Sequence, residues 1–224
     1  MSKDLLMSLL LEGSVDTIYM VLLSSMIAFF IGLPLGVILS VTSQGGILRN
    51  KPINSILSLL VNIGRSAPFV ILMIAIIPFT RWIVGTSIGI NAAVVPLSVA
   101  AIPFVGRVVE TSLREIDQGI IESALAMGAT PFEIIYKVLL PEGLPGIIGG
   151  LTLTVINLVG YSAMAGILGA GGLGDIAVRY GYQRFMPKVM VATVVILVIM
   201  VQLCQITGDK LASLTRHDRK ETTD

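Results

Sequence analysis

The sequence predicts an all-α polytopic membrane protein, and both its composition and its long apolar runs support this fold class. Hydrophobic residues make up 54% of the 224 residues and charged residues only 13%, whereas a typical soluble domain carries about 25% charged residues. A chain of this kind cannot cover a globule with polar side chains, so we expect membrane lipid around it. The net charge of +1 provides no basic surplus for binding nucleic acid.

Five apolar runs are each long enough to cross a bilayer, which takes about 20 mostly apolar residues in a helix. The first run is too long for the core of a secretory signal peptide, so it should be a retained span. The membrane domain then covers residues 13–207, and residues 208–224 form a cytoplasmic tail. Gly32 and Gly36 favour close helix packing, because small residues four apart let helices approach each other. The predicted spans are residues 17–41, 56–79, 88–109, 146–168 and 189–207.

The basic residues between the spans predict the orientation, because cytoplasmic loops of membrane proteins are enriched in Lys and Arg. The larger set follows the first and third spans and continues into the tail, so that side should be cytoplasmic. Five crossings then place the N-terminus outside and the C-terminus in the cytoplasm. The larger set is Arg49, Lys51, Arg107, Arg114, Lys137, Lys210, Arg216, Arg219 and Lys220, and the opposite set is Lys3, Arg81, Arg179, Arg184 and Lys188.

The cytoplasmic connection 110–145 carries strong local signals for two short helices. Asp117 can cap the first helix, and Gly128 suits the left-handed residue that closes it. Residues 130–133, with the sequence Thr-Pro-Phe-Glu, form a capping box with Pro at the first helical position. We expect Pro141 to end the second helix. On local grounds alone, the pair could also lie on the membrane surface without a partner.

The same loop resembles the cytoplasmic-loop signature of permease subunits of bacterial ABC importers. The pattern is Glu-x-Ala, three residues, Gly, nine residues, an aliphatic residue, x, Leu, Pro, and it is carried by Glu122, Ala124, Gly128, Val138, Leu140 and Pro141. Ser123 stands where the family usually has Ala, and Val138 where it often has Ile. The resemblance implies a coupling helix that fits a groove on a separate ATPase subunit. The implied contacts are Glu122, Ser123, Ala124, Ala126, Met127 and Gly128.

Two further stretches are similar to the permease of the methionine ABC importer: residues 171–185 (GGLGDIAVRYGYQRF) and 65–69 (RSAPF). The likeness extends over residues 13–207. It implies import of L- and D-methionine or derivatives across the bacterial inner membrane by alternating access. It further implies a permease homodimer, two ATPase subunits that hold ATP and Mg, and an extracytoplasmic methionine-binding protein. Another amino acid or small solute remains an alternative substrate, and an ion-coupled secondary transporter is an alternative class.

Other motifs do not predict chemistry on this chain. The sequence has no G-x-x-x-x-G-K-[ST] motif for ATP phosphates, so ATP should bind elsewhere. Residues 169–174 match G-x-G-x-x-G, but they follow a span rather than a strand, so we expect a flexible external turn. Ser162 lacks the second Gly of a nucleophile elbow, and the only histidine is His217 in the tail. We therefore expect no catalytic residue, metal site or cofactor.

Polar residues within the spans are candidates for the substrate path or gate. Arg65 lies inside the second span, where a charge should face protein or water. Its alternative is a structural charge bonded to carbonyls or to Glu110. In the fourth span, Asn157, Tyr161 and Met164 share one helical face, and Ser162 also interrupts the aliphatic run. Interhelical hydrogen bonding and core packing are the alternative for this group.

Overall fold

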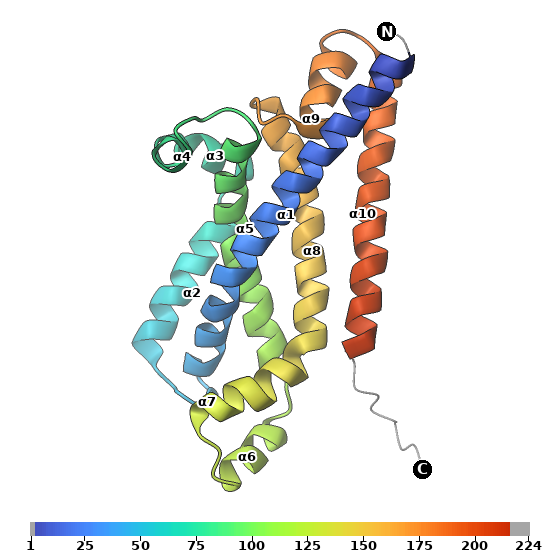
Figure 1. The fold of residues 1–224 in the computed structure, drawn as a ribbon. Coiled ribbons are helices and arrows are strands. Elements are labelled where there is room, and N and C mark those ends of the chain that lie inside the picture. Colours follow the sequence, from blue (N-terminus) through green and yellow to red (C-terminus); the bar gives the residue numbers. More distant parts are fainter. Residues whose placement is uncertain (1–2, 216–224) are drawn as a thin grey trace.

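The computed structural model describes residues 3–215, and all regular elements in this range are helical. Figure 1 shows an elongated bundle whose N- and C-terminal ends lie at opposite ends of the molecule. Four helices are long and apolar enough to cross a membrane, and a bent pair brings the total to as many as five. The fold is therefore that of a polytopic membrane protein. His217 and the basic residues Arg216, Arg219 and Lys220 lie outside the described residues.

The four long helices cover four of the predicted spans to within two residues at each end. Each helix also continues beyond its span at one end or at both. As a result, the first residues of the predicted tail continue the last helix. The long helices are α1 (Lys3–Thr42), α5 (Ile90–Arg114), α8 (Leu140–Ile167) and α10 (Pro187–Thr215).

Shorter elements connect these helices, some of them at the two ends of the bundle. In Figure 1, α6 and α7 lie at the lower end and α9 lies near the upper end. The short α-helices are α2 (Lys51–Ser66), α3 (Phe69–Ala75), α4 (Ile77–Val84), α6 (Gln118–Ala126), α7 (Pro131–Ile134) and α9 (Gly172–Ile176). Two π-helical turns are η1 (Ile135–Leu139) and η2 (Ala177–Tyr182).

Helix α5 forms the centre of the bundle and packs most extensively against α1. In α5, 56% of the most apolar 18-residue stretch is buried, against 11% of the corresponding stretch in α10. Gly32 and Gly36 of α1 face α5, and a Cβ atom on Gly36 would lie 2.5 Å from the carbonyl oxygen of Gly106. The packing interpretation of these glycines is therefore confirmed, since no larger side chain fits between the two backbones.

The second predicted span, 56–79, is not one continuous helix. α2 and α3 meet at an angle of 104°, with Ala67 and Pro68 in extended conformation between them. The cause is local, because the Pro ring disfavours helical geometry at the preceding residue. The prediction of a single helical run is therefore wrong here.

The glycine-rich turn after α8 is packed rather than flexible, which corrects the sequence-based expectation. Gly172 and Leu173 are buried, and the Leu173 N–H donates a 2.9 Å hydrogen bond to Thr17 Oγ1 of α1. A Cβ atom on Gly172 would lie 2.7 Å from that same oxygen. Helix α8, and not a strand, precedes the turn. The G-x-G-x-x-G match of residues 169–174 therefore does not mark a dinucleotide-binding site.

Candidate functional site

The first short helix of the predicted coupling loop, α6, has hydrogen-bonded caps at both ends. Asp117 Oδ1 accepts a 2.7 Å hydrogen bond from the Gly119 N–H, as predicted for the N-cap. Gly128 has φ +82°, and the closing bonds run from Gly128 N to Leu125 O at 2.9 Å and from Ala129 N to Ala124 O at 3.1 Å. This pair of bonds is the Schellman arrangement, which fixes the direction in which the chain leaves the helix.

The second helix begins with the predicted capping box. Thr130 Oγ1 accepts from the Glu133 N–H at 3.4 Å, and Glu133 Oε2 accepts from the Thr130 N–H at 3.0 Å. Lys137 Nζ adds an ion pair to Glu133 Oε1 at 3.0 Å. The Thr130 backbone N–H and then Lys137 lower the pKa of the Glu133 carboxyl to about 2. The box therefore carries its negative charge at neutral pH.

The second helix does not end at Pro141, which contradicts the prediction. α7, η1 and α8 form one continuous helical segment, Pro131–Ile167. In the π turn, the Leu140 N–H reaches back five residues to the Ile135 carbonyl, and this wider spacing removes the usual clash between a proline ring and the preceding turn. The second helix of the pair is consequently joined to the long helix α8 without a loop.

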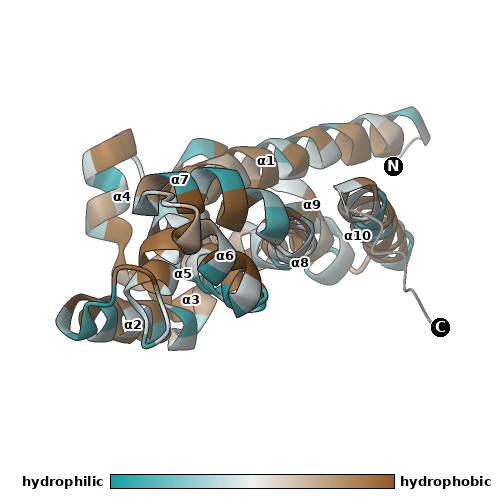
Figure 2. Ribbon diagram, turned by 90° about the horizontal axis from the view of Figure 1, so that it is seen from below, coloured by the Kyte–Doolittle hydropathy of each residue, from teal (hydrophilic) through white to brown (hydrophobic). Residues whose placement is uncertain are grey.

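Five of the six predicted coupling residues share an exposed surface. Glu122, Ser123, Ala126 and Gly128 are exposed, and Met127 is 83% exposed. Ala124 instead faces inward at 5% exposure, so it holds α6 against the bundle. In Figure 2, α6 and α7 lie across the lower end of the molecule, with hydrophilic and hydrophobic residues together on their visible face.

Two aromatic residues on this surface were not identified from the sequence. Phe132, inside the capping box, is 76% exposed, and Tyr136, just after the box, is 66% exposed. Their large exposed rings lie on α7 and η1, which follow α6 in the chain. The sequence alone does not show that these two aromatic side chains are exposed.

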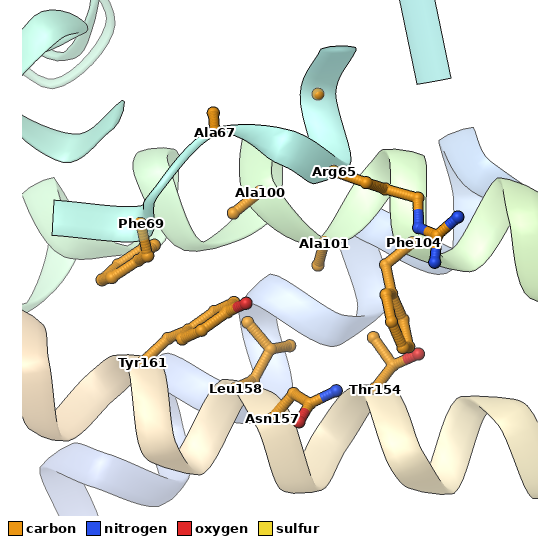
Figure 3. A pocket seen from close by; sticks show the side chains of 11 residues that line it. Arg65, Ala67, Phe69, Ala100, Ala101, Phe104, Thr154, Asn157, Leu158 and Tyr161 are labelled. Carbon is orange, nitrogen blue, oxygen red and sulfur yellow. The ribbon is translucent and has the colours of Figure 1, made fainter. Parts of the chain in front are cut away.

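A pocket between α2, α3, α5 and α8 contains three of the predicted path residues. Figure 3 shows the Arg65 guanidinium over Phe104, with Asn157 and Tyr161 on the opposite helix. The Arg65 Cζ atom lies 5.7 Å from the Phe104 ring centroid. The rings of Phe69 and Tyr161 are stacked, with their centroids 4.6 Å apart and an interplanar angle of 1°. The lining residues are Gly64, Arg65, Ala67, Phe69, Ala100, Ala101, Phe104, Thr154, Asn157, Leu158 and Tyr161.

Ser162 and Met164, the other two predicted path residues, lie outside this pocket. Ser162 is buried and its Oγ donates to the Val159 carbonyl at 2.8 Å, which agrees with a structural role. Met164 is 43% exposed elsewhere on α8. The sequence analysis did not identify Phe104 and Thr154 as pocket residues, since an aromatic and a hydroxyl residue in apolar helices carry no distinctive signal.

Glu110 does not pair with Arg65, so that alternative is wrong. Glu110 is 3% exposed and bonds Arg107 at 2.6 Å and Arg114 at 3.5 Å. Arg107 also donates a 2.6 Å hydrogen bond to Asn62 Oδ1, which ties α5 to α2. This charge cluster therefore ties the C-terminal half of α2 to α5 at the centre of the bundle.

Known proteins that are similar to this chain in sequence and fold are membrane permeases. Residues 32–211 match the family described as binding-protein-dependent transport system inner membrane component. The probable D-methionine transport system permease protein MetI of Vibrio cholerae is 52% identical over 93% of this chain and 93% of its own. Its counterpart from Pasteurella multocida is 47% identical over 92% of this chain and 94% of its own.

A solved structure agrees with these relatives. One chain of the MetNI methionine ABC transporter, crystallised in inward-facing conformations, superposes with a TM-score of 0.94 at 51% identity, over 97% of this chain and 100% of that chain. Together with the family match over residues 32–211, these observations establish that the chain is a multi-pass inner-membrane protein and a transport subunit. It belongs to the family of inner membrane components of binding-protein-dependent transport systems.

Proposed function

We propose that this chain is the permease subunit of an ATP-driven ABC importer for methionine, including L- and D-methionine or close derivatives. The observation that carries the ABC assignment is the rigid helix pair α6–α7, which presents Glu122, Met127 and Gly128 at one end of the bundle. The substrate class rests on the relatives, since two permeases named for D-methionine share 52% and 47% identity with it.

The proposed topology has five crossings, with the N-terminus outside and the C-terminus in the cytoplasm. In this arrangement α2 and α3 together make the second crossing, broken at Pro68. Support comes from the basic residues near α6, α7 and the end of α10, which lie toward one end of the bundle (Figure 1). The transmembrane domain covers 13–207, and the tail from 208 begins as a continuation of α10.

The proposed assembly contains two copies of this chain, two ATPase subunits that bind ATP and Mg, and an extracytoplasmic methionine-binding protein. The MetNI transporter at TM-score 0.94 supports an ABC assembly of this kind. The α6–α7 surface is the proposed ATPase contact. The largely exposed apolar face of α10 is suited to lipid.

The proposed mechanism is alternating access driven from the cytoplasmic helix pair. ATP binding closes the two ATPase subunits and brings the coupling helices of the two permeases together. Because α7, η1 and α8 form one continuous helical segment, a displacement of the loop becomes a tilt of α8, which lines the central pocket. Each ligand shifts the equilibrium only as far as it binds the two states differently.

Uptake of radiolabelled L-methionine tests the proposed function in cells that lack this chain, with and without its restoration. Unlabelled L-methionine, D-methionine and unrelated amino acids serve as competitors. We expect restored uptake that methionine isomers suppress and other amino acids do not. Absence of methionine-dependent uptake, with the chain present in the membrane, would overturn the substrate assignment. Persistence of uptake after inactivation of the partner ATPase would overturn the ABC assignment.

A further inference from the structure

We propose that Arg65 binds the carboxylate of the transported amino acid, in a substrate subsite formed by the pocket between α2, α3, α5 and α8. Asn157 and Tyr161 supply its other polar contacts, and Phe69 and Phe104 face the apolar side chain. This inference rests on the proposed function, because it assumes that an apolar amino acid passes through this chain. It assigns a molecular role to a pocket that is otherwise only a space among helices.

The first observation is that Arg65 carries a charge without an acidic partner in residues 3–215. The ion pairs of the described chain involve Arg107, Arg114, Lys137 and Arg179. The Arg65 guanidinium lies over the face of Phe104, which leaves its N–H donors available. A carboxylate suits these donors, because two parallel N–H···O bonds match the planar guanidinium.

The neighbouring charge cluster explains why Arg65 stays available. Glu110 is held by Arg107 and Arg114, and Asn62 on α2 is held by Arg107. These polar groups on the cytoplasmic side of Arg65 are therefore already bonded. A charge inside a membrane protein is costly unless it pairs or reaches water, so an incoming carboxylate would bind at a site prepared for it.

The remaining groups of the pocket fit the rest of an apolar amino acid. Neither the Asn157 amide nor the Tyr161 hydroxyl has a hydrogen-bond partner within the described part of the chain, whereas Thr154 Oγ1 already donates to the Gly150 carbonyl. The amide oxygen of Asn157 can accept from an ammonium group. The aromatic rings of Phe69, Phe104 and Tyr161 (Figure 3) suit a thioether, since sulfur makes favourable contacts with aromatic rings.

The pocket is too small for an amino acid in the present conformation. Its volume is about 40 Å³, which holds about three water molecules. The stacked rings of Phe69 and Tyr161 occupy one side, and Phe69 lies directly after the break at Pro68. Movement of α3 about this break would separate the two rings and widen the subsite without unfolding α2 or α8.

The test uses the complete importer, comprising this chain, its ATPase and its binding protein, reconstituted in proteoliposomes. Methionine import and binding-protein-stimulated ATP hydrolysis are measured on the same vesicles for wild type, Arg65→Gln, Arg65→Lys and Arg81→Gln. We expect Arg65→Gln to lower methionine imported per ATP about tenfold, and Arg65→Lys to lower it less. Arg81→Gln, which removes a charge near Ser87 and away from the pocket, should match wild type.

The outcomes separate this subsite from the proposed function. If wild-type vesicles import no methionine, the proposed function fails. If they do and Arg65→Gln stays within roughly twofold of wild type, the subsite is wrong. If import and hydrolysis fall in proportion, Arg65 is a structural charge, paired in the assembled dimer, and the subsite is again wrong. If Arg65→Gln fails to assemble, Asn157→Ala is tested in its place. Methionine import per ATP that is unchanged in Asn157→Ala would overturn the proposal.

Discussion

The helix pair α6–α7 and the central pocket differ in how their polar groups are bonded. In α6 and α7, the caps are satisfied locally by Asp117, Thr130 and Glu133. In the pocket, Arg65, Asn157 and Tyr161 have no hydrogen-bonding partners within the described chain, and the helix that carries Arg65 ends at an extended break. The first region is rigid by itself, whereas the second is incomplete by itself.

This difference fits the two tasks of a transport subunit. A segment that transmits force must keep its shape under load, which local caps and a continuous helix provide. A segment that binds and releases a solute must have unused hydrogen-bonding groups and a place to bend. This chain contains both features: a bend at the α2–α3 break and a continuous helical segment over Pro131–Ile167.

Gly128→Pro should have the largest effect, because it removes the corner on which the rigid region depends. Proline fixes φ near −65°, whereas Gly128 has φ +82°, and it also removes the N–H that bonds Leu125. We expect co-purified ATPase to fall about tenfold or more, with normal membrane insertion. Gly85→Pro alters an equivalent left-handed cap on α4, with φ +83°, and should retain the ATPase. Unchanged ATPase co-purification for Gly128→Pro would contradict the coupling assignment.

Glu110→Gln tests whether the region beside the pocket is held by its charge cluster. The substitution removes the charge shared by Arg107 and Arg114, and it leaves Arg107 partly unsatisfied beside Asn62. We expect a destabilisation of about 1–3 kcal/mol, measured as a lower midpoint of thermal unfolding in detergent. Glu115→Gln, on an exposed residue without an ion pair in the described chain, is the control. An unchanged midpoint would mean that α2 is held by apolar packing alone.

Met127→Ala sharpens the comparison by altering the exposed surface of α6 without touching its caps. The side chain is 83% exposed, so stability should stay the same, while affinity for the ATPase should fall about tenfold if Met127 enters the groove. Titration of the purified ATPase onto the permease in nanodiscs measures this effect. Leu214→Ala, at 81% exposure on α10, removes a comparable apolar side chain and should leave the affinity unchanged. Equal affinities for both variants would exclude Met127 from the contact.

The sequence predicted the local features of the coupling loop well because their causes are local. The N-cap at Asp117, the turn at Gly128 and the box at Thr130 each depend on residues within one helical turn. The same local reasoning failed at Pro141, because the π turn that accommodates this proline has no recognisable sequence signal. It also could not show that Ala124 faces inward, which depends on packing against the rest of the bundle.

The central pocket was only partly predictable because it is assembled from three separate segments. Arg65 stood out as a charge in an apolar run, and Asn157 and Tyr161 as polar residues on one helical face. Their meeting depends on the bend at Pro68 and on how α5 lies between α2 and α8, which residue periodicity does not encode. The partner of Glu110 was misassigned for a different reason. Arg107 and Arg114 lie three and four residues away on the same helix, a local pairing that helical spacing does predict.

The smallest expected effect concerns the capping box. Thr130→Ala removes the Oγ1 that accepts from the Glu133 N–H and should cost about 1 kcal/mol of local helix stability, seen as faster amide exchange at the start of α7. Ser55→Ala, a hydroxyl loss in the interior of α2, is the control. Because Glu133 has its pKa lowered from 4.5 to about 2, its contribution is present above the unfolded pKa and is lost as pH falls through the folded one. Amide protection of α7 should therefore stay constant from pH 8 to about pH 5, and a loss within that range would contradict the charged capping box.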